Sequence, residues 1–347
     1  MSTSLLTRPY SLNGHMRPVV RVGFTPDGEG LITCSADGYT RLWDVEGAHF
    51  IRNFGPLDSR GQIGETAAGQ GTSCTDFSIT SDGKYLAVGY VIEYVAFFSI
   101  YEAQPFICSY RPTEMTSFTV LSFSKDGRRL YVGGKAFMGK AAGILVLDVA
   151  DFHEIKEIAK IDTPSNVTAL ALSPLNDYIL VGFDNGSVQS FSTKSFRPEG
   201  ALSTPLSFGN EAIVEIKLHR DKLFTICARD RKVTLIGAKT LKQMKRILTE
   251  FPVHTCALHP LAEELFIYAG GVEARSVTQT VHVDDTFKLF LMDLAQDAKL
   301  GNFQLHVGPV HGITFSPNGH HIASCSEDGK GFLIKIGEDL CKYRFTG

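Results

Sequence analysis

An internal repeat restricts the fold of this chain more than any other feature of its sequence. Each copy has a short segment of alternating apolar residues, a turn, a second such segment, a second turn and a third segment. The copies are clearest over residues 19–44 and 310–336. Weaker copies turn at residues 81–83, 125–127, 173–176, 219–221 and 259–261. The pattern therefore predicts seven units of about 40 to 50 residues each.

The turns carry residue types that reverse the chain tightly. Thr25-Pro26-Asp27-Gly28 and Ser316-Pro317-Asn318-Gly319 occupy the same place in the first and last units. Proline presets φ near −65°, and Asp-Gly or Asn-Gly accepts the positive φ of a tight turn. The segments on either side are thus predicted to be paired antiparallel strands.

Strand-like units without helical segments predict an all-β fold. The one stretch that resembles a helix, Lys239–Leu248, fits a turn and an outer strand better. A four-stranded sheet cannot bury both faces alone, whereas stacked sheets in a closed ring do so and remove exposed edges. With this period, the prediction is a single seven-bladed WD-repeat β-propeller over residues 1–347. The expected blades are residues 15–54, 72–110, 116–161, 166–202, 211–248, 252–303 and 306–345.

Closure of such a ring needs a strand from one of the chain ends. Residues 8–12, from Arg8 to Leu12, lie just before Gly14-His15 and are placed to complete the last blade. Residues Cys341–Phe345 could supply the outer strand instead. We favour the N-terminal strand. Three further segments, Gly55–Gly71, Lys135–Gly143 and Ala269–Asp285, interrupt the repeat and are expected to be loops or insertions.

The WD signature is complete only once. Gly14-His15, Ser35, Asp37 and Trp43-Asp44 have its spacing. In such repeats the His, Ser, Asp and Trp side chains form a buried hydrogen-bonded network that stabilises the fold. We therefore assign His15, Ser35, Asp37 and Trp43 to structure and not to acid–base chemistry. The last unit keeps His306, Ser326 and Asp328 but has Ile334 in place of the tryptophan.

Composition excludes several classes of protein. The 347 residues are 44% hydrophobic and 20% charged, with a mean hydropathy of +0.02, as in an ordinary globular protein. No apolar run reaches the roughly 18 to 20 residues that span a bilayer, and Met1–Tyr10 lacks the apolar core of a secretory signal. The seven cysteines include no C-x-x-C pair, which is typical of free thiols in a reducing compartment. We expect a cytoplasmic protein without a membrane contact.

No motif predicts catalysis, a cofactor, a metal or a small-molecule substrate. Gly133-Gly134 and Gly270-Gly271 complete neither a dinucleotide motif nor a phosphate-binding loop. His254, Cys256 and His259 lie close in sequence, but no second cluster supplies the remaining metal ligands. There is no G-x-S-x-G sequence. The chain is therefore predicted not to be an enzyme, although a dispersed hydrolase site remains open.

One charged cluster lies in the fifth unit. Between residues 217 and 246 only Asp221 and Asp230 are acidic. The ten basic residues of this stretch are Lys217, Arg220, Lys222, Arg229, Arg231, Lys232, Lys239, Lys242, Lys245 and Arg246. The cluster fits either a solvated face or a docking surface for an acidic protein segment or RNA. Few aromatic residues are interleaved, so stacking on single-stranded nucleic acid is disfavoured.

A family resemblance rests on the sixth unit. Residues 269–280 resemble the Gly-Gly-Gly-Gln-Glu-Ala-x-Asp-Val-Thr-Thr-Thr insertion of the i subunit of eukaryotic translation initiation factor 3. Residues 12–15, 138–139, 228–230, 287–290, 306–310 and 326–329 are also similar to that family. The second unit departs from it, since Phe98 and Ser99 stand where Trp-Asp is expected. The chain looks like a divergent member.

The resemblance implies a scaffold that binds other proteins. In the family, the propeller grips a C-terminal segment of subunit b around blades five and six, and it lies beside subunit g on the small ribosomal subunit. The grip uses acidic residues: Asp221 matches one such position, and the second falls on Gly237. We take Asp221, Arg229, Asp230, Arg231 and Lys232 as candidate partner-binding residues. A generic WD-repeat adaptor for another signalling or ribonucleoprotein complex is the alternative, and direct RNA contact is left open.

Overall fold

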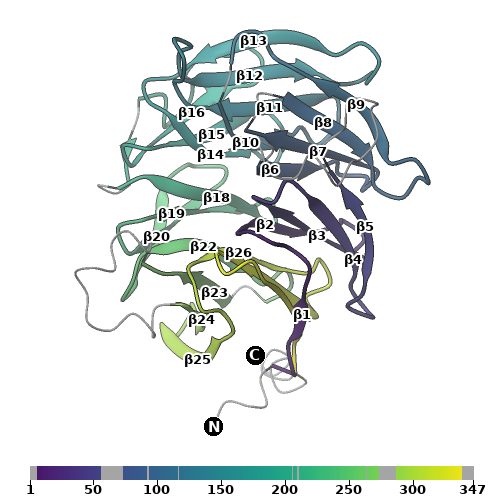
Figure 1. Cartoon of the computed structure of the whole chain (residues 1–347). Helices are drawn as coiled ribbons and strands as arrows, with labels where there is room; N and C mark the ends of the chain where they lie inside the picture. The colour runs from purple at the N-terminus through teal and green to yellow at the C-terminus, as the bar shows by residue number, and fades with distance from the viewer. Residues whose placement is uncertain are drawn as a thin grey trace. The chain divides into compact units, whose positions relative to one another are not determined.

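The computed structural model describes residues 6–55, 73–91, 94–115, 117–204, 206–208, 211–262, 264–272 and 287–337. All the named elements in this part of the chain are β-strands, which form seven four-stranded antiparallel sheets (Figure 1). The chain divides into two compact units. Unit 1 comprises Met1–Ser35, Arg41–Asn53 and Glu250–Gly347, and unit 2 comprises Ala36–Thr40 and Phe54–Thr249.

Unit 2 contains four of the sheets, each built from consecutive strands. The first two are β6 (Cys74–Ile79), β7 (Tyr85–Tyr90), β8 (Tyr94–Ser99) and β9 (Phe106–Tyr110), and β10 (Phe118–Phe123), β11 (Arg129–Gly134), β12 (Gly143–Asp148) and β13 (Lys156–Asp162). The next two are β14 (Val167–Leu172), β15 (Tyr178–Phe183), β16 (Ser187–Ser192) and β17 (Leu206–Ser207), and β18 (Ile213–His219), β19 (Leu223–Ala228), β20 (Lys232–Gly237) and β21 (Gln243–Leu248).

Neighbouring sheets of unit 2 share their cores. Phe97 on β8 and Phe123 on β10 lie in one buried cluster, with ring centroids 6.5 Å apart. A second cluster joins Val146 on β12 to Val181 on β15, and a third joins Leu180 on β15 to Ile226 on β19. Each inner sheet thus buries both faces against a neighbour, which a single four-stranded sheet cannot do alone.

Unit 1 contains most of the other three sheets. They are β2 (Val19–Phe24), β3 (Gly30–Ser35), β4 (Thr40–Asp44) and β5 (Phe50–Phe54); β22 (Val253–Leu258), β23 (Leu265–Gly270), β24 (Lys288–Asp293) and β25 (Ala298–Gln304); and β26 (Val310–Phe315), β27 (His321–Ser326), β28 (Gly331–Lys335) and β1 (Tyr10–Leu12). One buried cluster includes Ile267 on β23 and Ile313 on β26, and another includes Leu333 on β28 and Trp43 on β4.

The N-terminal strand completes the last of these sheets, as predicted. β1 pairs antiparallel with β28, so that Tyr10 faces Leu333 and Leu12 faces Gly331 (Figure 1). The Leu12 side chain is 1% exposed and anchors the strand in the core. The competing strand at Cys341–Phe345 lies outside the described residues.

The turns have the predicted chemistry. In the turn between β6 and β7, the Thr80 hydroxyl donates to Asp82 at 2.6 Å, and Gly83 has a φ of 72°. The turn between β14 and β15 has no glycine and places Asn176 at a φ of 56°. Asparagine tolerates that left-handed conformation better than most residues, which explains its position there.

The interruptions of the repeat lie between strands. Residues 135–142 connect β11 to β12, and the Phe137 and Lys140 backbones pair across this loop. Of the other two predicted insertions, only Gly55 and residues 269–272 belong to the described part of the chain. The stretch Lys239–Leu248 forms a turn and the outer strand β21, as the sequence indicated.

Candidate interaction surfaces

A threonine connects the predicted WD network in the first sheet. His15 Nε2 lies 2.8 Å from Thr33 Oγ1, and Trp43 Nε1 donates to the same oxygen at 2.9 Å. The Ser35 hydroxyl donates to the carbonyl oxygens of Pro18 and Arg17, at 2.9 and 3.1 Å. We call His15, Thr33 and Trp43 the Thr33 network. All three are buried, so the network stabilises the fold from inside.

The structure also shows what the sequence missed in this network. Asp37 belongs to residues 36–40 of unit 2, where its carboxylate accepts the Tyr39 backbone N–H at 2.9 Å. Thr33, which is not part of the WD signature, provides the shared oxygen. It lies two residues before Ser35 on β3, and alternate residues of a strand share a face. That spacing was the available signal.

The last sheet has a corresponding network with different chemistry. His306 Nδ1 lies 3.1 Å from Asp328 Oδ2, and His306 Nε2 lies 2.9 Å from Ser324 Oγ. Burial opposes ionisation of Asp328, but hydrogen bonds from His306 and from the Lys330 and Val307 backbones outweigh it and lower the pKa of that carboxyl. We call His306, Ser324 and Asp328 the Ser324 network. Ser324 was missed in the same way as Thr33, two residues before Ser326.

A paired His and Asp could suggest acid–base catalysis, but this pair is enclosed. The His306 side chain is 0% exposed, and both of its ring nitrogens are engaged. A general base must come within hydrogen-bond reach of a substrate proton. The pair therefore serves the fold.

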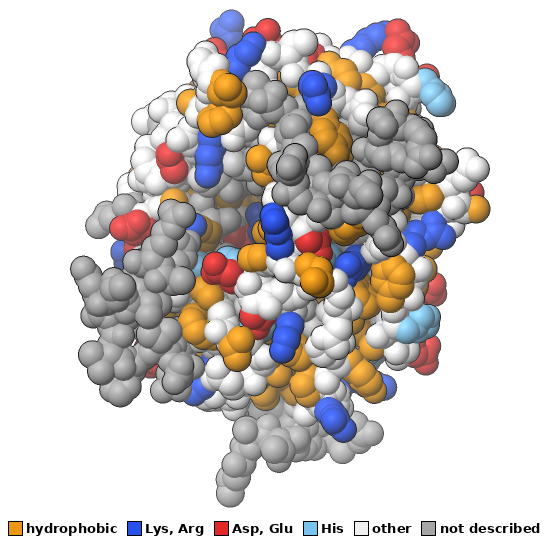
Figure 2. Space-filling view, in the orientation of Figure 1, with side chains coloured by type: hydrophobic (Ala, Val, Ile, Leu, Met, Phe, Trp, Pro, Cys, Tyr) orange, Lys and Arg blue, Asp and Glu red, His pale blue; other side chains and the backbone are white. Residues whose placement is uncertain are grey.

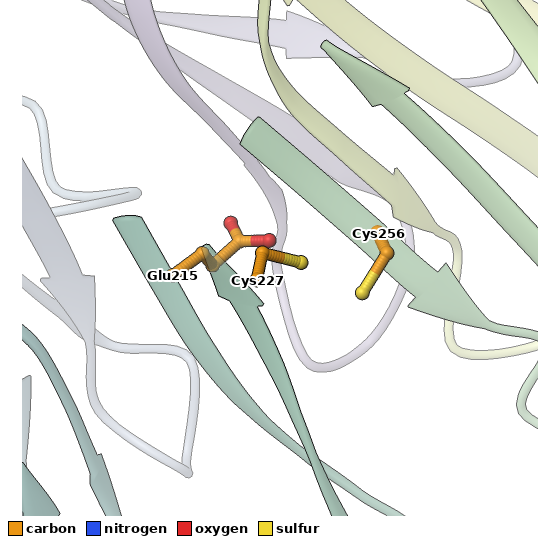
Figure 3. A group of neighbouring side chains, drawn as sticks. All are labelled: Glu215, Cys227 and Cys256. Atoms are coloured by element: carbon orange, nitrogen blue, oxygen red, sulfur yellow. The ribbon is translucent and has the colours of Figure 1, made fainter. Parts of the chain in front are cut away.

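Residue types that bind metals lie in both units. Glu215 on β18 and Cys227 on β19 are cross-strand partners, and Lys217 Nζ lies 2.9 Å from the Glu215 carboxylate. Figure 3 labels these two side chains and also Cys256, which belongs to β22 of unit 1. Within unit 2, Glu215 is thus accounted for by an ion pair.

The histidines near Cys256 are core residues. His259 Nε2 lies 2.8 Å from the Gly319 carbonyl oxygen, and His259 Nδ1 accepts the Leu261 backbone N–H at 3.1 Å. His254 is stacked on His311 with ring centroids 5.9 Å apart. His259 thus uses both ring nitrogens to join two turns.

The candidate partner-binding residues are not brought together. Asp221 lies in the turn between β18 and β19, and Arg229, Asp230 and Arg231 lie between β19 and β20, with Lys232 beginning β20. Consecutive turns of an antiparallel sheet lie at opposite ends. β19 has six residues, so the two groups are separated by roughly 20 Å.

Some of these charges already have partners inside unit 2. Asp221 Oδ1 accepts a hydrogen bond from Lys125 Nζ at 2.7 Å, with 60% of the Asp221 side chain exposed. Lys232 Nζ lies 2.8 Å from Asp230, whose side chain is only 9% exposed. Asp221 is therefore accessible, and a cation from a partner would compete with Lys125 for it.

The first two sheets of unit 2 form a groove that the sequence did not predict. It has a volume of about 960 Å³ and is lined by four turns, around Asp82, Gln104, Asp126 and Asp151. Tyr85 and Phe152, with ring centroids 4.9 Å apart, belong to its lining. No single segment carries this site, which explains why it was missed.

The face of the molecule drawn in Figure 2 carries charges of both signs. Figure 2 shows Lys and Arg side chains scattered among acidic and apolar ones on the face that it presents. No helix among the described residues is long and apolar enough to cross a bilayer.

A family model matches the two segments that contain the polar networks. The model for "WD domain, G-beta repeat" matches residues 6–44 and 298–333. The first match includes His15, Thr33 and Trp43, and the second includes His306, Ser324 and Asp328. The sequence repeats between these two segments are more degenerate copies.

Curated relatives match nearly the whole chain. Eukaryotic translation initiation factor 3 subunit I from Caenorhabditis briggsae is 24% identical over 97% of this chain and 99% of its own length. The proteins of the same name from Dictyostelium discoideum and Drosophila melanogaster are 27% and 24% identical, over 93% of this chain and 92% and 94% of their own lengths. The identity is low and the coverage is nearly complete.

A solved structure supports the fold class. The β-propeller domain of Cps50 (Swd1) from Myceliophteria thermophila matches 94% of this chain and 99% of its own, with a TM-score of 0.73 and 12% identity. Together with the seven four-stranded sheets, this match confirms the predicted all-β, seven-bladed WD-repeat propeller.

Proposed function

Because the chain belongs, as a divergent member, to the eukaryotic translation initiation factor 3 subunit I family, we propose that it is a non-catalytic scaffold subunit of that factor. The observation that carries the proposal is the match over at least 90% of both chains with every subunit I relative described above. A generic WD-repeat adaptor has no reason to match this family along its full length. No enzymatic activity is indicated by these relatives or by the fold.

The proposed partners are the C-terminal segment of subunit b and, beside it, subunit g, in a complex on the small ribosomal subunit. The chain acts in the cytoplasm as a single propeller domain, without a cofactor or a small-molecule substrate. Asp221 supports the first contact, because its carboxylate is exposed at the end of the fifth blade. An Arg or Lys of the b segment would pair with Asp221 in place of Lys125.

Purification of the tagged chain from its own cells tests the proposal. Initiation factor 3 subunits b and g should co-purify with small ribosomal subunits. A stable complex that lacks every initiation factor subunit would refute the proposal and favour the generic adaptor.

Variants test the candidate contacts separately. Asp221→Ala should weaken association with the b segment about tenfold, as expected for loss of an interfacial ion pair. Arg231→Glu with Lys232→Glu should weaken it too if this end of the blade meets an acidic surface, and the loss should diminish at high salt. Lys156→Glu on β13 is a matched control, because Lys156 is exposed and pairs with Glu154 at 2.9 Å. If the double variant bound as the parent chain does at every salt concentration, the turn at Arg231 would be excluded as a contact with the partner.

A further inference from the structure

The outer strand of the fifth blade has an unoccupied edge. In the sheet β18-β19-β20-β21, β21 pairs with β20, and no other strand of the described chain pairs with it in that sheet. Such an edge presents backbone N–H and C=O groups that can accept another strand. The outer strand β13 differs, because it carries charges of both signs, which protect an edge: Lys156, Glu157, Lys160 and Asp162.

β21 carries cations but no acidic residue, and it exposes apolar side chains. Met244 is the extra residue of a β-bulge, because the strand pairing skips from Gln243 to Lys245. Arg246 and Leu248 are alternate residues beyond the bulge and share a face. Met244 is 65% exposed and Leu248 is 74% exposed, against 40% for Ile158 on β13. Two large apolar side chains on either side of a cation therefore face solvent on an edge strand, which is unfavourable unless a partner covers them.

The charge of this segment indicates the chemistry of that partner. Residues 238–249 contain Lys239, Lys242, Lys245 and Arg246 and no Asp or Glu. They also contain no aromatic residue. Single-stranded nucleic acid binds through aromatic stacking as well as charge, whereas exposed Met and Leu suit apolar side chains of a protein. The surface thus fits an acidic protein segment with apolar residues better than RNA.

The course of β21 connects the two separated groups of candidate residues. The strand begins after the β20–β21 turn, which lies at the same end of the sheet as Asp221. It ends next to Arg231, since the Thr249 backbone N–H donates to the Arg231 carbonyl oxygen at 3.0 Å. A segment that follows β21 would pass from one group to the other.

We propose that β21 is the docking edge for an acidic, extended segment of a partner protein, which adds to the fifth blade as a fifth strand. Apolar side chains of that segment cover Met244 and Leu248, and its carboxylates pair with Arg246 and with the lysines of the adjoining turn. The proposal rests on the proposed function only for the complex in which the partner is sought.

Backbone hydrogen exchange tests strand addition directly. Exchange is measured for the full chain alone and for the chain in the complex that co-purifies with it. The amides of residues 243–248 that do not already bond to β20, which are every second one, should exchange at least tenfold more slowly in the complex, because added strand hydrogen bonds protect them. The outer strand β13 is the internal control and should not change. Equal exchange of those β21 amides in both samples would overturn the proposal.

Side-chain variants distinguish a protein strand from RNA. Met244→Glu with Leu248→Glu should reduce retention of the partner at least tenfold, while Ile158→Glu on β13 should retain it and leave the melting temperature unchanged. A 20-nucleotide single-stranded RNA is the competing probe. Binding of that RNA that is lost in Arg246→Glu and retained in the Met244/Leu248 variant would overturn the proposal in favour of nucleic acid.

The two proposals fail in different ways. Recovery of initiation factor subunits without protection of β21 would refute strand addition and leave the scaffold function intact. Protection of β21 in a complex without those subunits would refute the scaffold function and support strand addition.

Discussion

The first and last sheets of unit 1 each hold a buried histidine in place, but they do so with different groups. Each has a buried histidine whose Nε2 meets a hydroxyl on the second strand, Thr33 in one and Ser324 in the other. In the first sheet that hydroxyl also accepts from Trp43. In the last sheet Ile334 replaces the tryptophan, and His306 is held by the carboxylate of Asp328.

This difference teaches that a buried histidine can be held in such a sheet without the tryptophan. In the Thr33 network one hydroxyl contacts both His15 and Trp43, whereas the Ser324 network contains an ionisable pair that is nearly excluded from solvent. Neutral buried hydrogen bonds contribute modestly and depend little on pH. Buried pairs are sensitive to loss of one partner and to acid. The two sheets should therefore respond differently to the same substitutions.

Removal of the histidine should separate the two networks most strongly. His306→Ala leaves Asp328 buried without its main partner, so we expect a loss of about 3 kcal/mol in the free energy of unfolding. His15→Ala removes the contact with Thr33 but leaves Trp43 bonded to it, so about 1 to 2 kcal/mol is expected. Urea denaturation of both variants measures the difference. Equal losses would show that the Asp328 carboxylate adds nothing to the last sheet.

Acid should weaken the Ser324 network. Hydrogen bonds lower the pKa of Asp328 in the folded chain below the ordinary value of 3.8. A carboxyl group whose pKa is lower in the folded chain than in the unfolded chain stabilises the fold at pH values above its unfolded pKa. That contribution is lost as the pH falls through the pKa of the folded chain. Asp328→Asn should therefore be less stable than the parent chain by about 2 kcal/mol at neutral pH. The difference in stability between the parent chain and Asp328→Asn should become smaller below roughly pH 5.

The control for this experiment comes from the first sheet. Thr33→Val removes a hydroxyl and no titrating group, so its destabilisation should be constant over the same pH range. The measurement is the urea midpoint of each variant as a function of pH. If the difference in stability between the parent chain and Asp328→Asn stayed constant at acidic pH, the lowered pKa of Asp328 would be contradicted.

The tryptophan bond should have a smaller effect. Trp43→Phe keeps an aromatic ring in the core but removes the donor to Thr33, which should cost about 1 kcal/mol. Thr33→Val in the same chain should then cost less than it does alone, because the two residues share one hydrogen bond. A double-mutant cycle measures this coupling. Additive effects would mean that the bond contributes nothing, and that the tryptophan acts only by packing.

The fold could be predicted from the sequence more fully than the interaction surfaces could. Alternating strands and Asp-Gly turns are local signals, so the number of sheets and the place of β1 could be predicted. Thr33 and Ser324 were missed because their role depends on a partner 18 residues away. The groove around Asp82 and Asp151 arises from turns of two sheets, and no local pattern encodes it. The separation of Asp221 from Arg231 likewise depends on strand topology and not on sequence distance.

The aspartate after the tryptophan should contribute least to the difference between the two sheets. Asp44 accepts the Gly47 backbone N–H at 2.5 Å and lies 3.4 Å from His49, and its side chain is 32% exposed. The last sheet has Lys335 at the corresponding position and uses no such acid. Exposed pairs contribute little because water and salt screen them, so Asp44→Ala should cost about 0.5 kcal/mol. Thermal denaturation at low and high salt checks this value. A loss near that of His306→Ala would show that Asp44, which the last sheet does without, is what the complete signature adds to the first sheet.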